Sequence, residues 1–318
     1  KVPGARVRFQ DESLTSVEAE SRLKKRKKKY EKGDIDAEAA AIILQDFLEN
    51  MKNKECTIFS ARNISELFQQ IKSIANLQLL GGCTLISQIP EKAISIKRIP
   101  ELRQISKHER FIDFGPGTTL SEILAIGERH LPKVLYEALK TIANPMIRNL
   151  ATIGGNIYSF EQKQTLFAPL LALDAKLELK TKEETKYIPL QSFTPLPRGQ
   201  IISNIRVPLS EWDVEIFYRV GPENQITENS ASYAFLADTE NNSIRNLRIA
   251  FAGKITFHSS ELETKLIGIR LPLHKNDIED FIKEASLEFD KITEKQSYNP
   301  ILKRQFLNLT RYSLEQLT

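Results

Sequence analysis

The stretch "NPMIRNLATIGGNIYSF", residues 144–160, sets two adjacent glycines inside an otherwise apolar run. Asn144 and Pro145 open it, and because the residue before a proline is pushed out of the α region, a preceding helix is expected to end here. Gly154 and Gly155 then leave the backbone bare. Adjacent glycines inside an apolar run indicate that another group approaches the backbone closely at this point.

A second glycine pair ends another strand-like run, "LLGGCTL" at residues 79–85. Glycine adopts positive φ without strain and lets a ligand touch the backbone, so such a turn can direct several N–H groups toward one anion. Each pair taken singly is also what an ordinary tight turn contains. The two pairs together with their neighbours are the more specific signal.

A third glycine motif, "GPGTTL" at residues 115–120, contains half of the dinucleotide-binding fingerprint G-x-G-x-x-G after a predicted strand. Leu120 occupies the place of the third glycine, and no clean strand ending in an acidic residue follows. The Rossmann interpretation is therefore rejected.

Hydrophobic periodicity predicts alternating strands and helices on both sides of the glycine motifs. After the first 55 residues, the pattern predicts a β-α-β unit formed by a strand at 56–61, a helix at 63–75 and a strand at 77–82. Further elements are expected at 92–99, 110–120 and 201–209 (strands), at 120–131 and 133–143 (helices), and at 165–181, where a helix runs into a strand.

The composition changes after Pro208, where two strands around Asn241 and Asn242 precede a helical tail at 276–317. This order is typical of an α+β domain. The predicted organisation is an extension at 1–54, a domain at 55–208 with subdomains of about 55–110 and 111–208, and a terminal domain at 209–318.

Most of the excess positive charge is concentrated in "RLKKRKKKYEK", residues 22–32. Such runs occur in nucleic-acid and anionic-membrane patches. Because no aromatic interleaving or nucleic-acid module accompanies the run, we interpret it as a solvated helix or tether and expect neither nucleic acid nor membrane as a partner. An amphipathic helix is expected next, at 36–52.

Length and composition indicate a protein of two or three domains with real cores, since the 318 residues are 41% hydrophobic and 27% charged with a net charge of +4. No run of about 18 apolar residues occurs and no signal-peptide pattern opens the chain, so a cytoplasmic location is expected.

Cysteine and histidine are too sparse for a metal centre. Cys56 and Cys83 are the only cysteines, and the four histidines lie scattered. Iron–sulfur and zinc sites need closely spaced sets of these ligands, so we expect no metal site in this chain. No Ser/His/Asp set or carboxylate pair indicates a catalytic residue either.

Six motifs in order give the chain a resemblance to a known family, the FAD-binding (medium) subunits of the molybdenum hydroxylases, which include xanthine dehydrogenase and carbon monoxide dehydrogenase. The motifs are "LLGGCTLI", "GPGTTLSEI", "IANPMIRNLATIGGNI", "LLALDAKLEL", "IISNIRVP" and "FYRVG". The resemblance runs from about Cys56 to the C-terminus. It implies an α+β fold in which two α/β subdomains clamp FAD and a smaller domain of antiparallel strands and helices follows.

The resemblance also implies the residues that contact FAD. The first glycine loop would wrap the pyrophosphate, the second would lie against the flavin, two isoleucines would pack on the cofactor, and an arginine would stand beside the isoalloxazine. In that order these residues are Leu80, Gly81, Gly82, Cys83, Thr84 and Leu85; Thr152, Gly154, Gly155 and Asn156; Ile201 and Ile202; and Arg219.

Three positions depart from the family pattern. Gln164 and Thr165 stand where a Ser-Asp pair is common, so a side-chain contact to FAD at Thr165 would be weakened or lost. Cys83 replaces a Thr or His. Arg148 lies in the motif "IANPMIRNLATIGGNI", before the second glycine pair. It is expected to be a structural hydrogen-bond donor that fixes this loop.

By resemblance, the chain is an oxidoreductase subunit whose FAD passes electrons from the iron–sulfur clusters of a partner to NAD or another acceptor. An iron–sulfur subunit and a molybdenum-cofactor subunit would be its partners, with purines the commonest substrate of the assembly. Two alternatives remain open, a non-catalytic scaffold subunit with a degenerate flavin site and a stand-alone flavin reductase.

The extension is hypothesised to dock the cluster-bearing partner, because fused family members join the cluster domain to the flavin domain at this place. An intramolecular helix packed on the flavin domain is the alternative. The docking residues would be Ile43, Phe47, Leu48 and Lys24 to Lys29.

Overall fold

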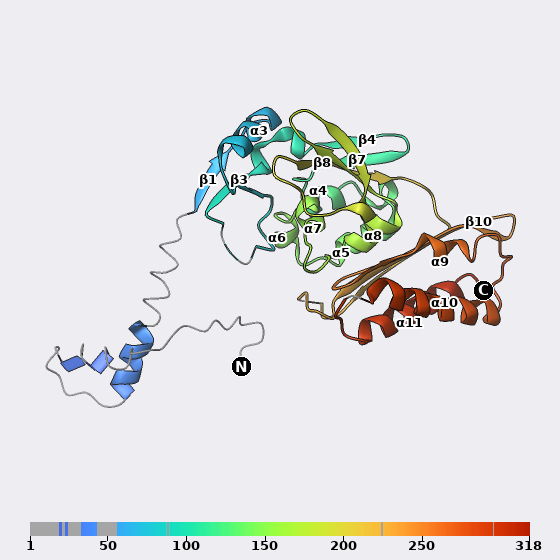
Figure 1. Ribbon diagram of the computed structural model, residues 1–318. Coiled ribbons are helices and arrows are strands. Elements are labelled where there is room, and N and C mark those ends of the chain that lie inside the picture. The colour runs from blue at the N-terminus through green and yellow to red at the C-terminus, as the bar shows by residue number, and fades with distance from the viewer. Residues whose placement is uncertain are drawn as a thin grey trace. The chain divides into compact units, whose positions relative to one another are not determined.

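The computed structural model describes most of the chain after residue 55 and short pieces before it. The described residues are 19–20, 23–24, 33–42, 56–86, 88, 90–223, 225–294 and 296–318. Their contacts divide into two compact units, one of Lys1–Thr57 with Ile89–Lys92 and one of Ile58–Gln88 with Ala93–Thr318. Figure 1 labels the helices and strands.

The extension is described in part. Residues 33–42 are helical, which confirms the first part of the helix expected at 36–52. Ala19, Ala39 and Ile42 are buried together in this unit. Outside the described residues lie Ile43, Phe47, Leu48 and most of Lys24 to Lys29.

The β-α-β opening is confirmed, with one strand inserted between its two strands. Its elements are β1 (Thr57–Ser60), α3 (Ile64–Ser73), β2 (Gln78–Leu80) and β3 (Lys92–Ser95), and the sheet order is β1-β3-β2. Helix α3 begins at Asn63, whose side chain accepts a hydrogen bond from the Glu66 amide. Its apolar stripe, Leu67, Phe68 and Ile71, packs into a small separate core.

A second, antiparallel sheet follows, in the order β4-β5-β8-β6-β7. Its strands are β4 (Ile105–Lys107), β5 (Phe111–Phe114), β6 (Lys176–Lys180), β7 (Thr185–Pro189) and β8 (Ile201–Pro208). Five helices lie along one side of it (Figure 1), namely α4 (Leu120–Leu124), α5 (Lys133–Lys140), α6 (Pro145–Arg148), α7 (Ile153–Ile157) and α8 (Phe167–Ala172). Strand alternation turns one face toward these helices and leaves polar groups on the other.

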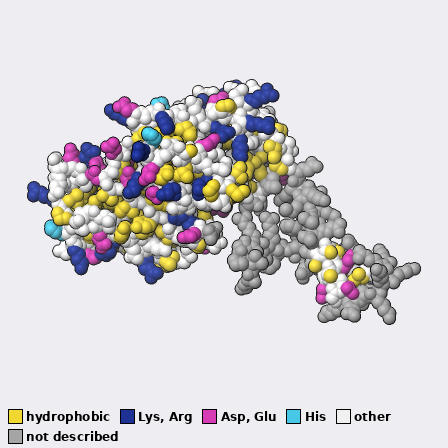
Figure 2. All heavy atoms as spheres, turned by 180° about the vertical axis from the view of Figure 1, so that it is seen from behind, with side chains coloured by type: hydrophobic (Ala, Val, Ile, Leu, Met, Phe, Trp, Pro, Cys, Tyr) yellow, Lys and Arg dark blue, Asp and Glu magenta, His cyan; other side chains and the backbone are white. Residues whose placement is uncertain are grey.

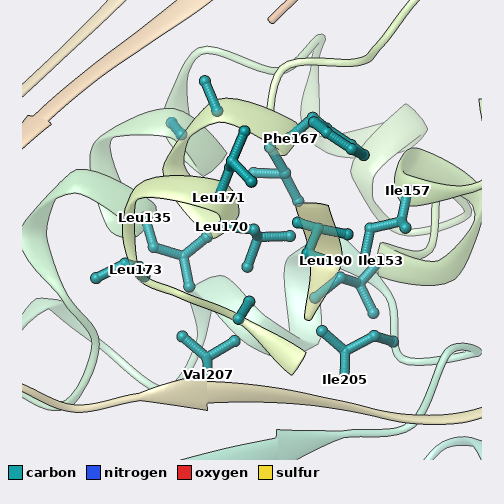
Figure 3. Packing of buried hydrophobic residues seen from close by; sticks show 14 of the residues in the cluster. Leu135, Ile153, Ile157, Phe167, Leu170, Leu171, Leu173, Leu190, Ile205 and Val207 are labelled. Carbon is teal, nitrogen blue, oxygen red and sulfur yellow. The ribbon is translucent and has the colours of Figure 1, made fainter. Parts of the chain in front are cut away.

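A large hydrophobic core lies between this sheet and its helices. Figure 3 shows Leu170 and Leu171 of α8 converging with Ile153 of α7 above Ile205 and Val207 of β8. Because α7 carries the second glycine pair, this packing fixes the position of that pair on the sheet.

Two predicted elements end earlier than expected. The helix expected at 120–131 stops at Leu124, and Gly127, at φ +92°, starts a short 3-10 turn. The strand expected at 92–99 stops at Ser95, whose hydroxyl accepts a hydrogen bond from the Lys97 amide. Both ends are set by local turn chemistry that competes with the regular element.

The residues from Val214 onward form a four-stranded antiparallel sheet with helices. Its elements are β9 (Val214–Val220), β10 (Ala231–Glu240), β11 (Ser243–Ala252), β12 (Thr256–His258), α9 (Ser260–Thr264), α10 (Lys275–Thr293) and α11 (Ile301–Glu315), with strand order β12-β11-β10-β9. The predicted hairpin is confirmed, since Asn241 and Asn242 both adopt positive φ between β10 and β11. The predicted α+β fold is thereby confirmed.

This sheet is buried on both faces. Tyr233 and Phe235 of β10 face the core that contains α10 and α11, while Ala234 and Leu236 face the core that contains α8. Strand β10 therefore reads as a continuous apolar run rather than an alternating one, which is typical of a strand covered on both sides.

Charged and apolar side chains are mixed on the surface of the described residues. Figure 2 shows basic and acidic side chains interspersed over one face of the described part, with apolar groups between them. Among the described helices, none combines the length and apolar character that a membrane crossing requires.

A pair of ionisable side chains is buried beside the sheet. His258 on β12 and Glu263 on α9 are 5% and 2% exposed, and His258 Nε2 lies 3.4 Å from Glu263 Oε1. Glu263 Oε1 accepts a hydrogen bond from the Ile249 amide at 2.8 Å, and Arg248 Nη1 lies 3.8 Å from its Oε2. Burial raises the pKa of Glu263 from 4.5 to about 7 and lowers the pKa of His258.

Replacing Glu263 with Gln is expected to flatten the pH dependence of stability. The folded-state pKa of Glu263 lies above the unfolded value, so the folded state holds a proton more tightly and the free energy of unfolding falls as the pH rises from about 4.5 to about 7, by up to about 3 kcal/mol in the absence of compensation. Urea unfolding of wild type and Glu263→Gln at several pH values measures the difference in slope. His258 is present in both proteins, so its own titration largely cancels.

The matched control is Glu261→Gln, which removes a carboxylate from the same helix at an exposed position. It is expected to retain the wild-type pH profile. A Glu263→Gln protein with the wild-type slope would show that this carboxyl ionises as freely in the folded state as in the unfolded state.

Candidate functional site

The two glycine loops lie directly against one another. A Cβ added at Gly82 would lie 1.7 Å from the carbonyl oxygen of Leu150, and one added at Gly81 would lie 2.7 Å from Thr152 Oγ1. Neither distance is compatible with a side chain. The first loop therefore needs glycine in order to rest its backbone on the second.

The third glycine motif supports the second loop from behind. The Leu120 amide donates to the Ala151 carbonyl at 2.9 Å, and the Gly154 amide donates to the Pro116 carbonyl at 2.9 Å. A Cβ at Gly154 would lie 2.7 Å from Pro116. Three chain segments that are distant in sequence are thus joined through backbone contacts, and Gly154 is needed for the closest of them.

Gly155 is the exception among the four glycines. A Cβ at this position would meet only Thr152 Oγ1, at 3.2 Å, and the residue is exposed. Packing within the chain therefore gives little reason for a glycine here. Its bare backbone is the feature that a ligand lying on the loop would use.

The conformation of the second loop differs from the expected turn. Residues Ile153–Ile157 form the short helix α7, and Thr152 Oγ1 caps it by accepting a hydrogen bond from the Gly155 amide at 3.2 Å. None of the four glycines has a positive φ, whereas Cys83 does, at +59°. Left-handed backbone is therefore not the reason for glycine at these four positions, and at Gly81, Gly82 and Gly154 the reason is close approach of neighbouring atoms.

The outer end of the first loop points away from the core. Leu80 is half-buried at the end of β2, and Cys83, Thr84 and Leu85 are exposed, with Leu85 at 52%. Their backbone lies next to the second loop through Gly81 and Gly82. The structure thus places Gly81 and Gly82 against the residues that begin the second loop, Leu150 to Thr152.

Asn156 closes the segment that follows the second loop. Its Oδ1 accepts a hydrogen bond from the Leu166 amide at 3.1 Å, and the residue is 8% exposed. Thr165 is buried beside this link. Gln164 is buried as well and donates to the Gln162 carbonyl at 3.1 Å, so the polar loop is held by its own hydrogen bonds.

The two isoleucines occupy apolar cores. Ile201 is 2% exposed and belongs to the core of the first sheet, and Ile202 is 7% exposed and belongs to the core beneath the second sheet. Both lie at the start of β8, where the two cores meet. The structure does not bring their side chains to the exposed side of the glycine loops, and a contact with a cofactor stays a prediction.

Arg219 on β9 is a half-buried cation held by carbonyl groups. Its guanidinium donates to the carbonyl oxygens of Pro222, at 2.6 Å, and of Gln225, at 3.1 Å. Burial lowers its pKa. In the part of the chain that the structure describes, no carboxylate lies within ion-pair distance of it, although the more distant charge of Glu223 partly offsets the effect of burial on its pKa. The guanidinium can therefore still attract an anionic ligand.

Arg148 has the structural role expected of it. Its Nη1 donates to the carbonyl oxygens of Ile142 and Ala143, both at 2.7 Å. Ala143 adopts a positive φ of 45° at the end of α5. The guanidinium therefore holds the strained turn that leads into α6 and the second loop.

Sequence reasoning missed two residues of the loop at 159–164. Gln162 Nε2 donates to the carbonyl oxygens of Thr227 and Ser230, and Lys163 Nζ lies 4.4 Å from the ring centres of both Phe160 and Phe167. The spacing of Lys163 between two phenylalanines was the available signal.

A separate hollow of about 510 Å³ lies along α3 and the second sheet. Phe68, Lys72, Lys180 and Ser203 are among its lining residues, and none of the predicted cofactor residues is. Within the described ranges, no group of three or more His, Cys, Asp and Glu side chains is placed to hold a metal ion.

The residues present fit an extended anionic cofactor. Gly155 offers a bare and accessible backbone, the neighbouring first loop is exposed from Cys83 onward, and Arg219 offers a cation without a carboxylate partner. FAD combines a flat ring system that lies against backbone with a diphosphate that needs N–H donors and positive charge. No side chain at these positions is placed to act as a general acid or base.

Comparison with known proteins yields two family matches. The sequence profile of the family described as "FAD binding domain in molybdopterin dehydrogenase" matches residues 51–210, and that of "Holliday junction resolvase" matches residues 1–50. The two matches adjoin at residue 50. The first covers half of the chain.

Similar curated proteins are flavin subunits and oxidases. The xanthine dehydrogenase FAD-binding subunit of Escherichia coli O157:H7 is 30% identical over 49% of this chain and 54% of its own length. The nicotinate dehydrogenase FAD-subunit of Eubacterium barkeri is 21% identical over 80% of this chain and 96% of its own length. The indole-3-acetaldehyde oxidase of Arabidopsis thaliana is 27% identical over 67% of this chain, which spans only 19% of that protein.

Solved structures show the same fold. A Cu,Mo-CO dehydrogenase chain superposes with a TM-score of 0.70 at 17% identity, covering 83% of this chain and 97% of its own. Carbon monoxide dehydrogenase from Hydrogenophaga pseudoflava gives 0.68 at 18% identity, covering 83% and 96%. At these identities the likeness concerns the fold alone.

Replacing Gly155 with Val is expected to abolish FAD binding while the protein stays folded. The Val side chain would project from the exposed surface of the loop, where only Thr152 Oγ1 is near, and would occupy the space of a cofactor lying there. Flavin absorbance of the purified variant and its thermal unfolding measure the two effects. A folded variant with full flavin content would show that FAD does not lie on this loop.

Gly82→Ala is the contrasting variant, because its Cβ would overlap the Leu150 carbonyl. We expect it to destabilise the protein by about 1–3 kcal/mol or more, as overpacking does. Gly155→Ala has no such overlap and is expected to leave stability unchanged or raise it by up to about 1 kcal/mol, since alanine favours the helix over glycine.

Proposed function

The chain belongs to the family of FAD binding domains in molybdopterin dehydrogenases, and we propose that it binds one FAD on its paired glycine loops and works as the electron-transferring flavoprotein component of a molybdenum hydroxylase. The observation that carries this proposal is the accessible bare backbone at Gly155, beside the first loop and in a chain whose other paired glycines are explained by packing.

The chain's own residues would bind and orient the cofactor. Backbone N–H groups of the first loop would receive the diphosphate, and the exposed side of α7 at Gly155 would receive the ring system. Arg148 holds the turn before this loop by two hydrogen bonds of 2.7 Å. Arg219 would supply a positive charge near the cofactor. When bound, FAD supplies the exchange between single-electron carriers and a two-electron acceptor.

The partners and the acceptor are proposals that rest on the relatives. One relative is named as the medium chain of a carbon monoxide dehydrogenase and another as the medium chain of a glyceraldehyde dehydrogenase. We propose that an iron–sulfur subunit supplies electrons, that a molybdenum-cofactor subunit transforms the substrate, and that NAD or another acceptor receives the electrons. The relatives' names include xanthine, nicotinate and carbon monoxide, so the flavin unit does not specify the substrate.

The purified protein is expected to release one FAD per chain on denaturation. Both glycine loops are positioned together by the packing described above, so the site does not depend on a partner for its shape. Absorbance of the released flavin, measured against protein concentration, gives the stoichiometry. Protein that carries no FAD and does not take up added FAD would favour the scaffold alternative.

The extension receives a different interpretation from the one based on resemblance. Residues 1–50 match a Holliday junction resolvase profile and not the flavin family, and the first compact unit contains them. We propose that the extension is independent of the flavin site. This proposal competes with the hypothesis that it docks an iron–sulfur partner.

Deleting residues 1–54 tests the two interpretations of the extension. We expect the shortened protein to fold, to retain FAD and to co-purify with an iron-containing partner as well as the full chain does, because the described flavin-family elements begin at β1. Loss of the iron-containing partner with FAD retained would instead support docking by the extension.

A further inference from the structure

The segment between Asn156 and Leu166 forms a loop whose two ends are joined by a hydrogen bond. Asn156 Oδ1 accepts a hydrogen bond from the Leu166 amide at 3.1 Å, which brings the two ends of the segment together. Asn156 follows directly on Gly155 of α7, the accessible glycine. The two joined ends of this loop therefore lie next to the second glycine loop.

The same loop is fastened to the terminal domain at its other side. Gln162 Nε2 donates to the carbonyl of Ser230 at 3.2 Å, and the Lys163 amide donates to the carbonyl of Gly253 at 2.8 Å. The segment 221–230 also contains the carbonyl groups that hold Arg219. The loop thus spans from the glycine backbone to the surroundings of Arg219, two places where the cofactor is proposed to lie.

Lys163 carries an uncompensated positive charge within this loop. Its Nζ lies 4.4 Å from the ring centres of Phe160 and Phe167, and Phe167 is 3% exposed. The side chain is half-buried, burial lowers its pKa, and no carboxylate among the described residues pairs with it. Ring faces offset part of the lost hydration of an ammonium group but leave its charge unneutralised.

A cation in this position has a consequence for a redox cofactor nearby. Reduction adds negative charge to a flavin, and a fixed positive charge stabilises the reduced form more than the oxidised one. The effect is larger for a partly buried charge than for an exposed one, because water and salt screen the exposed charge.

We propose that the ammonium group of Lys163 places a fixed positive charge near the flavin. This charge raises the reduction potential of the bound FAD. The inference rests on the proposed function. The rings of Phe160 and Phe167 hold the ammonium in place, and the hydrogen bonds of Asn156, Gln162 and the Lys163 amide hold the loop.

A purely structural role is the competing explanation. Lys163 would then join Phe160 to Phe167 and contribute only to loop stability. Lys163→Met separates the two roles, because methionine is a long, unbranched side chain that can pack on aromatic rings but carries no charge. Lys163→Arg keeps the charge and the ability to stack on the rings.

The experiment is a spectroelectrochemical titration of FAD bound to the full chain, in wild type and three variants. We expect Lys163→Met to have a more negative midpoint potential than wild type and Lys163→Arg to have a potential close to it. The matched control is Lys254→Met, which removes an exposed lysine next to Gly253, the residue whose carbonyl accepts from Lys163. This control is expected to leave the midpoint potential unchanged.

An unchanged potential in flavin-loaded Lys163→Met would overturn the proposal, and so would an equal shift in Lys254→Met. Loss of FAD from Lys163→Met with retention by Lys163→Arg would support a role of the charge, whereas loss from both would assign Lys163 a structural role and overturn it. Wild-type protein that binds no FAD would refute the proposed function itself, which distinguishes the two failures.

Discussion

The contact between the backbone of Gly82 and the carbonyl of Leu150 is the constraint on which the candidate site depends. At 1.7 Å from an added Cβ, it excludes every side chain at this position and sets the distance between the two glycine loops. The second loop is in turn fixed by α7, whose Ile153 and Ile157 are fully buried in the core under β8. The geometry of the exposed glycine loops is thus determined by packing that begins in the interior of the protein.

The glycines of the two pairs are present for two different reasons, which the sequence alone does not distinguish. Gly82 and Gly154 are required because neighbouring backbone or proline atoms would overlap any side chain. Gly155 has no such neighbour, so its bare backbone is accessible from the exposed side of the loop. A glycine motif therefore indicates close approach, and only the surrounding structure shows whether the approaching group is the protein's own chain or a ligand.

Four ionisable side chains show two different responses to burial. Glu263 and His258 lie together, and burial disfavours the charged form of each, so the pair tends toward neutrality near pH 7. Arg219 and Lys163 are only half-buried and keep their charge, held by carbonyl oxygens in one case and aromatic rings in the other. Burial thus disfavours charge at the Glu263–His258 pair, whereas Arg219, on β9 of the same sheet, and Lys163, in the loop after α7, retain their charges.

The sequence by itself determined the fold class, the β-α-β opening and the Asn241-Asn242 hairpin, because these depend on local propensity and on motifs in order. It also predicted that the two glycine loops belong together. It also indicated the structural role of Arg148. Only the tertiary structure decided that Gly82 rests on Leu150, that Ile201 and Ile202 lie in two different cores, and that Lys163 stands between Phe160 and Phe167. These facts depend on which distant segments meet, and a periodicity of 2 or 3.6 residues along the chain does not specify that.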